Sequence, residues 1–338
     1  MDVNESGGAP LLQTPTLSAK GLCMAVQESV GRAAAKPMGK PKLGKLARRE
    51  EREFYLFISL WIIGFIAFDA GPILASFAIS FTNWSMMTPP NWTGLQNYQR
   101  LIADPLFYTA MWNSLYFGVG SVGLGLIVSF LLALLLNQKV LGISVFRTIF
   151  YLPSVVSGIA VAILWIMILH QDFGLINTVL SWFGIKGPGW LVQPQWAKPA
   201  LILMSLWGAG GSMVIYLAGL QSVPQHLYEA ASIDGAGPWM KFWHVTVPMM
   251  SPVIFYNLIV GFIASLQGFV LVLIMTNGGP ANATLMFGLY IYRVAFQFFQ
   301  MGYASALAWI LLVVIMAITA LQFLGAKYWV FYEGEAAC

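Results

Sequence analysis

Few side chains in this sequence are arranged for covalent or metal chemistry. The three histidines, His170, His226 and His244, lack a ligand spacing such as HExxH and have no acidic cluster beside them. Cys23 and Cys338 stand near opposite ends of the chain, so neither a disulfide framework nor a thiolate metal site is indicated. The sequence therefore predicts no catalytic residue and no metal site.

Two glycine patterns resemble nucleotide-binding motifs in their residue spacing but lack the surrounding features that such motifs need. Gly118, Gly120 and Gly123 read GxGxxG, but they lie within a long apolar segment with no preceding strand, where small residues are better explained by helix packing. The segment Gly39–Lys45 is one residue short of a phosphate loop, and Leu46 stands where Ser or Thr must hold magnesium. If ATP drives this protein, we expect another chain to bind it.

The most structured polar stretch covers residues 222–252. Apolar residues at i, i+3 and i+4 predict two short helices in it, with Leu227, Ala230 and Ala231 in the first and Trp239, Phe242 and Trp243 in the second. Glycines at 235 and 237 break the first helix, and Pro238 favours the start of the second. The resulting elbow either only connects two spans or docks a partner through its small-residue face and the charges of Glu229 and Asp234.

The elements that hold this elbow are apolar. Of the 338 residues, 59% are hydrophobic and 9% are charged, which excludes an ordinary soluble enzyme. Nine of the 17 Lys and Arg residues precede residue 54, in a Gly, Pro and Ala-rich stretch without apolar periodicity. We expect residues 1–53 to be a disordered basic tail and not a nucleic-acid-binding surface.

Six apolar runs are long enough to cross the hydrocarbon core of a membrane, which needs roughly 20 residues each. The sequence predicts an all-α integral membrane protein with spans near Phe54–Phe81, Trp112–Leu136, Thr148–Leu169, Pro199–Leu220, Pro252–Met275 and Ala304–Phe323. A kink is predicted in the first span at Gly71 and Pro72. Asp69 is the one ionisable residue well inside an apolar run, and we interpret it as a cap or interface residue rather than a proton relay.

The distribution of basic residues indicates the orientation. With the N-terminus inside, thirteen of the 17 Lys and Arg residues are cytoplasmic, and Arg100, Lys186, Lys198 and Arg293 lie outside. Both termini are thus predicted to be cytoplasmic, and the 222–252 elbow lies on the cytoplasmic side. The loop between the third and fourth spans carries an apolar helical stripe from Phe173 to Phe183, which predicts a short helix on the outer surface, either as packing or as a docking surface.

The elbow also carries a family resemblance. The string EAASIDGAG at Glu229–Gly237, followed by Pro248 and Pro252, resembles the EAA loop of the permease subunits of binding-protein-dependent ABC importers. Further segments are similar to the sugar-importing branch, and to the larger maltose-type permease within it: Gly94–Phe107, Phe146–Pro153, Leu217–Ala231, Thr276–Pro280 and Met301–Trp309.

This resemblance implies a function and a set of partners. The chain would be a permease subunit, not itself an enzyme, in the bacterial or archaeal inner membrane. Its partners would be a second permease, an ABC ATPase dimer that binds ATP and magnesium, an extracytoplasmic solute-binding protein and membrane lipid. The permease domain would cover residues 54–326, with a coupling loop at 221–251 and a C-terminal tail at 327–338. The residues implied in ATPase coupling are Glu229, Ala230, Ala231, Asp234, Gly235 and Gly237.

By the same resemblance, the cargo passes between the fourth and fifth spans. The matching positions are Met204, Trp207, Gly208 and Gly211 on the fourth span and Gly261, Ala264, Ser265 and Gly268 on the fifth, and Ser212 and Gln267 are neighbouring hydrogen-bonding groups. The near absence of Lys and Arg in the spans favours a neutral sugar or oligosaccharide. A glycerophosphodiester-type solute and a secondary carrier remain alternatives, although a carrier usually shows inverted repeats and midplane charges.

Overall fold

The computed structural model describes residues 45–138 and 140–331, and they divide into a unit that ends at Asp69 and a unit from Ala70 onward. The first unit is the helix α2 (Lys45–Phe65), in which Arg49 and Glu53 form an exposed ion pair at 2.9 Å. Residues 45–53 are therefore helical, which corrects the prediction of a disordered tail over that stretch. Residues 1–44 of the predicted tail lie outside the described residues.

The predicted kink in the first span takes the form of a π-helical turn. This turn, η1 (Ile66–Ala70), holds the exposed Asp69 and directly precedes α3 (Gly71–Ser80) with Pro72 in its first turn. Pro72 has no N–H to donate to the preceding turn, and its ring crowds the carbonyl four residues earlier. A π-helical turn accommodates that crowding without ending the helix.

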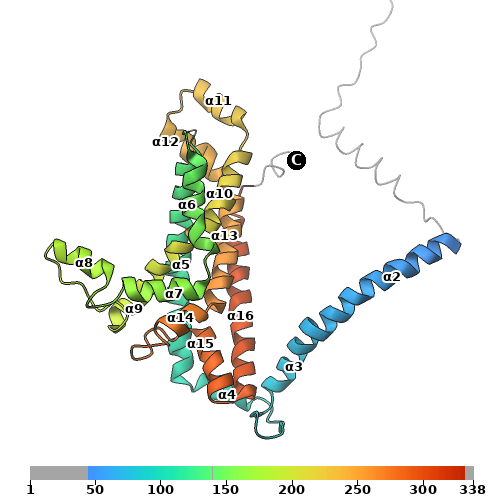
Figure 1. Ribbon diagram of the computed structural model, residues 1–338. Helices are drawn as coiled ribbons and strands as arrows, with labels where there is room; N and C mark the ends of the chain where they lie inside the picture. The colour runs from blue at the N-terminus through green and yellow to red at the C-terminus, as the bar shows by residue number, and fades with distance from the viewer. Residues whose placement is uncertain (1–44, 139, 332–338) are drawn as a thin grey trace, which may run out of the picture. The chain divides into compact units, whose positions relative to one another are not determined.

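In the second unit, the long helices lie side by side as a bundle (Figure 1). They are α5 (Pro105–Leu136), the α9–η2–α10 segment (Pro194–Ser205, Leu206–Ala209 and Gly210–Ser222), the α12–η3–α13 segment (Pro238–Lys241, Phe242–Thr246 and Val247–Gln267) and α16 (Met301–Ala326). The described residues contain five helical segments apolar and long enough to span a membrane, or six if a bent pair is included. The prediction of an all-α membrane fold is thus confirmed.

The bent pair is the third apolar segment, which the sequence predicts as a span without indicating a bend. Helix α6 (Ile143–Val155) meets α7 (Gly158–Ile168) at an angle of 97°. The chain leaves helical geometry at Val156 and Ser157, shortly after Pro153 inside α6. Figure 1 shows α7 running across the bundle toward α9 and the projecting α8 (Leu175–Trp182), which is the short helix predicted from Phe173–Phe183.

The fifth apolar segment is also interrupted, within the stretch predicted as a single span. Helix α13 ends at Gln267, and a separate helix α14 (Val270–Met275) follows the extended Gly268 and the non-helical Phe269. Gly288, in α15 (Phe287–Tyr292), allows α15 to approach this break, since a Cβ there would lie 3.1 Å from the Gln267 carbonyl oxygen. The fifth segment therefore changes direction in the region where the resemblance places the cargo.

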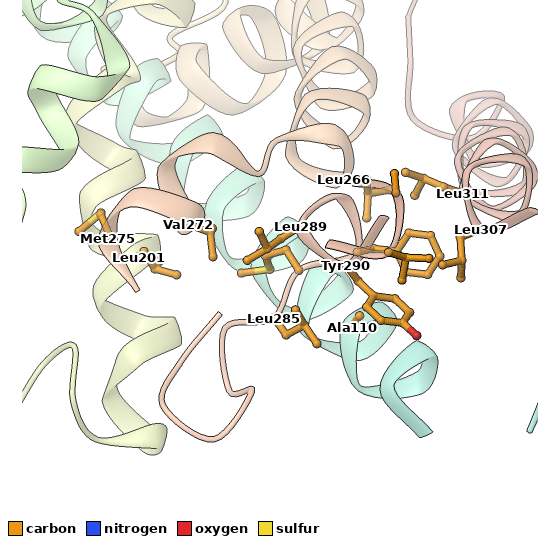
Figure 2. Close-up of a cluster of buried hydrophobic side chains, with 14 of the residues drawn as sticks. Ala110, Leu201, Leu266, Val272, Met275, Leu285, Leu289, Tyr290, Leu307 and Leu311 are labelled. Carbon is orange, nitrogen blue, oxygen red and sulfur yellow. The ribbon is translucent and has the colours of Figure 1, made fainter. Parts of the chain in front are cut away.

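The main hydrophobic core lies between α5, α9, α14, α15 and α16. Figure 2 shows part of it, with Ala110 of α5, Leu201 of α9, Val272 of α14 and Leu289 of α15 directed toward one another or toward α16 residues Leu307 and Leu311. A second core joins the other half of α5 to α10 and α13 through Ala133, Met213, Tyr216 and Met250. Helix α5 contributes to both cores and is the central support of the unit.

Polar contacts fix the end of the bundle opposite α11. Asp104 caps α5 by accepting from the backbone N–H of Leu106 at 2.9 Å, and it also accepts from the hydroxyls of Tyr290 and Tyr303. Burial raises the pKa of Asp104, but the tyrosine and backbone hydrogen bonds outweigh that effect, and the pKa lies below its usual value. Burial and the neighbouring carboxylate raise the pKa of Tyr290.

Candidate functional site

A cavity of about 490 Å³ lies between α5, the α9–α10 segment and the broken α13–α14 segment. Eight of the ten residues predicted on the substrate path line it: Met204, Gly208, Ser212, Gly261, Ala264, Ser265, Gln267 and Gly268. The two spans that the resemblance indicated thus face a shared cavity. The residues that line the cavity include no Asp, Glu, Lys or Arg.

Trp207 and Gly211 are the two predicted path residues outside this cavity. Trp207 packs edge-on against Trp165 of α7, with ring centroids 5.9 Å apart, and lines a separate cavity of about 260 Å³ beside α6 and α7. A Cβ on Gly211 would meet Ser154 of α6 at 3.8 Å. Both residues face the bent third segment and not this cavity.

The sequence reasoning missed the contribution of α5 to the cavity wall. Ser121 and Ser129 of α5 line it, together with Ser205, Asn257 and Phe269. Ser129 donates a hydrogen bond to the Ala209 carbonyl at 3.1 Å, and Asn257 donates to the Val253 carbonyl at 2.9 Å. The cavity wall therefore presents hydroxyl and amide groups together with an aromatic ring.

Small residues hold the cavity helices close together. A Cβ on Gly118 would lie 3.1 Å from the Ser265 hydroxyl, and a Cβ on Gly261 would lie 3.1 Å from a Val122 methyl. These contacts draw α13 onto α5, as expected for small residues at helix interfaces in membranes. Gly118 thus serves in helix packing, as the sequence analysis predicts for the glycines of the GxGxxG pattern.

The predicted elbow is formed by α11 (Gln225–Ile233), a glycine corner and α12. Helix α11 ends at Ile233 with Asp234 as its C-cap, and Gly235 adopts a left-handed conformation with φ of +80°. Gly237 precedes Pro238, which begins α12 as predicted. Figure 1 shows α11 and α12 together at one end of the bundle.

Two hydrogen bonds brace the elbow from within. The hydroxyls of Tyr228 in α11 and Thr246 in η3 lie 3.0 Å apart, and the Lys241 ammonium donates to the Ser232 hydroxyl at 2.7 Å. The π-helical turn η3 then joins α12 to α13 without a break. The elbow is consequently fixed to the end of the fifth span.

Five of the six residues predicted in coupling are exposed on the elbow: Glu229, Ala230, Asp234, Gly235 and Gly237. Ala231 is half-buried on the inner side of α11. The Glu229 carboxylate accepts a hydrogen bond from Gln225 at 3.0 Å within the same helix. The exposed surface of the corner therefore carries two carboxylates and small side chains.

The histidines form no site. His170 stacks on Phe173 with ring centroids 3.7 Å apart, and His244 contacts the Met240 carbonyl at 3.1 Å. Within residues 45–138 and 140–331, no three His, Cys, Asp or Glu side chains gather in a group that could hold a metal ion.

A bundle of membrane-spanning helices with a neutral cavity and a braced elbow defines a membrane transport subunit, and sequence comparison gives the family. Residues 125–327 match the family described as the binding-protein-dependent transport system inner membrane component. The chain belongs to this family of ABC transporter permeases.

Individual relatives match most of the chain. It is 39% identical over 299 residues to the probable ABC transporter permease protein YesP of Bacillus subtilis, covering 87% of this chain and 96% of YesP. It is 37% identical over 281 residues to the lactose transport system permease protein LacF of Rhizobium radiobacter, covering 81% of this chain and 93% of LacF.

A solved structure gives the same fold. A chain of a bacterial ABC transporter involved in the import of the acidic polysaccharide alginate is similar with a TM-score of 0.73 and 28% identity, covering 84% of this chain and 99% of that chain. A further structure shows the alginate transporter in complex with a periplasmic protein that holds an alginate pentasaccharide. The resemblance to ABC importer permeases is thereby confirmed.

Proposed function

We propose that this chain is the permease subunit of an ATP-driven, binding-protein-dependent importer for a neutral sugar or oligosaccharide. It forms half of a translocation path whose other half comes from a second permease. An extracytoplasmic binding protein delivers the sugar, and a partner ATPase dimer supplies the energy. The lactose permease and the alginate importer among the similar proteins support a saccharide cargo.

The chemistry of the cavity is the observation that carries the proposal. Its polar groups are the hydroxyls of four serines on α5, α9 and α10, that of Ser265, and the amides of Asn257 and Gln267. Such groups exchange hydrogen bonds with sugar hydroxyls and need no charge on the cargo. Phe269, stacked on Tyr292 at 5.4 Å, adds an apolar ring of the kind that packs on a sugar face.

In this proposal, the elbow couples the cavity to the ATPase. The exposed corner at Gly235 docks on the ATPase in the cytoplasm, where both termini also lie, and ATP and magnesium are bound by the ATPase. Closure of the ATPase dimer pushes the elbow, and η3 passes the displacement directly into α13, which lines the cavity. The chain itself carries no enzymatic step.

The test measures sugar uptake and ATP hydrolysis by the complex reconstituted in liposomes, with and without its binding protein. Ala264→Leu narrows the cavity, and Ala218→Leu is the matched control because Ala218 is an exposed α10 residue that does not line it. We expect Ala264→Leu to reduce uptake and sugar-stimulated hydrolysis together, with Ala218→Leu close to wild type.

Uptake that continues without ATP would overturn the proposal in favour of a secondary carrier. Competition by a glycerophosphodiester but not by neutral sugars would retain the importer and overturn the neutral cargo. Unchanged sugar uptake in Ala264→Leu would show that the cavity is not the path.

A further inference from the structure

A second hollow lies on the opposite side of α5 from the transport cavity. It is a groove of about 650 Å³ between α5 and α9, lined only by Pro, Gly, aliphatic and aromatic residues. From Trp112 to Leu124 it follows thirteen residues of α5, whose ends are about 18 Å apart along the helix. That length is close to one leaflet of a membrane whose hydrocarbon core is about 30 Å thick.

The groove owes its depth to a close approach between the two helices. A Cβ on Gly120 would lie 2.5 Å from the end of the Ile202 side chain, so a larger residue there would displace that end from its place in the groove floor. Side chains along the rim of the groove are exposed: Trp112 is 64% exposed and Val119 is 62% exposed. The groove is therefore an apolar surface that lacks a cover from the described part of the chain.

A single cation stands beside one end of the groove. The Lys198 ammonium lies 5.0 Å from the centre of the Tyr116 ring, and Tyr116 lines the groove. Lys198 donates one hydrogen bond, to the buried Asn113 side chain at 3.1 Å. Within residues 45–138 and 140–331, no carboxylate forms an ion pair with Lys198.

We infer that this groove binds one acidic phospholipid, with an acyl chain along α5 and the phosphate at Lys198. The groove accepts a hydrocarbon chain because its lining is apolar over the length of a leaflet. The ammonium supplies the complementary charge at the end where the aromatic residues Trp112 and Tyr116 gather, as is usual near membrane interfaces. Asn113 and Tyr116 hold the ammonium in place, so the headgroup meets a cation already positioned.

The site differs from the transport cavity in both location and chemistry. The cavity carries serine hydroxyls and side-chain amides on the other face of α5, whereas the groove is lined by aliphatic and aromatic residues, with the Tyr116 hydroxyl as its one side-chain oxygen. Lipid binding here does not depend on which solute is carried, and a lipid count by mass remains informative if the proposed sugar specificity fails.

The test counts lipids on the assembled transporter by native mass spectrometry after reconstitution in equal amounts of phosphatidylglycerol and phosphatidylcholine. We expect the wild type to retain one phosphatidylglycerol per copy of this chain and Lys198→Gln to lose it. Lys198→Arg should restore it, and Lys186→Gln, at an exposed loop lysine, should behave as wild type. Equal phosphatidylglycerol retention by wild type and Lys198→Gln would overturn the inference.

A second measurement asks what covers the groove. In a variant with Cys23 and Cys338 replaced by serine, Leu124→Cys places a thiol in the lining. A membrane-soluble maleimide should label it in the assembled transporter, and Val119→Trp, which fills the groove, should remove the retained phosphatidylglycerol. Protection of the thiol by the partner permease would overturn lipid as the occupant.

Discussion

The Lys241 ammonium lies 2.7 Å from the Ser232 hydroxyl and donates a hydrogen bond to it across the corner between α11 and α12. This contact joins the two helices of the elbow by side chains, in addition to the backbone turn at Gly235. Because both residues sit outside the exposed corner itself, they brace the elbow without occupying the surface proposed to meet the ATPase.

Loss of this brace should weaken coupling rather than assembly. Lys241→Met removes a hydrogen bond in an exposed setting, and we expect about 1 kcal/mol of effect, or up to about fivefold less sugar carried per ATP hydrolysed. Lys241→Arg keeps a charged donor and serves as the control. The measurement is the ratio of uptake to hydrolysis in liposomes, and a ratio unchanged in Lys241→Met would show that the contact is dispensable.

The left-handed backbone at Gly235 gives a sharper test of the elbow. Gly235→Val forces a β-branched residue to φ of +80°, at a cost of about 1–3 kcal/mol, and should reduce ATP-coupled uptake roughly tenfold. Gly237→Val is the matched control for the backbone, since it adds the same side chain to the same coupling surface where φ is −71° and the space is open. Similar activities in the two variants would contradict a role for the turn geometry.

Another glycine position should govern stability instead of coupling. A Cβ on Gly302, in the first turn of α16, would overlap the Thr82 carbonyl oxygen, and the Gly302 N–H donates to Trp84 at 3.1 Å. Gly302→Ala should lower the thermal midpoint of the purified protein, with a destabilisation of about 1–3 kcal/mol. Gly325→Ala, in the same helix with open space, should leave the midpoint unchanged.

The Asp104 network predicts a pH dependence of stability. Its pKa lies below the usual 3.8, so the carboxylate stabilises the fold above about pH 4, and this contribution is lost as the pH falls through the folded-state pKa. Asp104→Asn should destabilise by about 1–3 kcal/mol at pH 7.

The difference between Asp104→Asn and wild type should be constant from pH 8 to pH 5 and narrow below about pH 4. The exposed Asp172→Asn is the control for a general charge effect. A difference that stays constant down to pH 3 would show that the carboxylate charge is not what stabilises the network.

Much of this architecture follows from local sequence signals. Long apolar runs predict the spans, and the Gly235–Pro238 corner predicts the elbow because glycine and proline determine backbone geometry directly. The 97° bend between α6 and α7 was missed, since an apolar run has the same hydropathy whether it is straight or broken.

The walls of the cavity were only partly predictable. The resemblance indicated residues on the fourth and fifth spans, but Ser121 and Ser129 of α5 were missed. Helix α5 is apolar on all sides, so its sequence pattern does not reveal which face meets a cavity. That assignment needs the packing of Gly118 and Gly261 between α5 and α13.

The polar contacts of α5 also constrain how the protein is made. Asn113 donates to the carbonyls of Asn282 and Leu285, and Ser114 accepts from the backbone N–H of Phe287, across separations of 169 to 173 residues. During synthesis, α5 emerges from the ribosome long before these partners exist. The buried polar groups of α5 therefore have no partners until three further apolar segments have been inserted. The bundle reaches its final packing only near the end of translation, and a chain truncated before residue 287 lacks the hydrogen bond between Ser114 and Phe287.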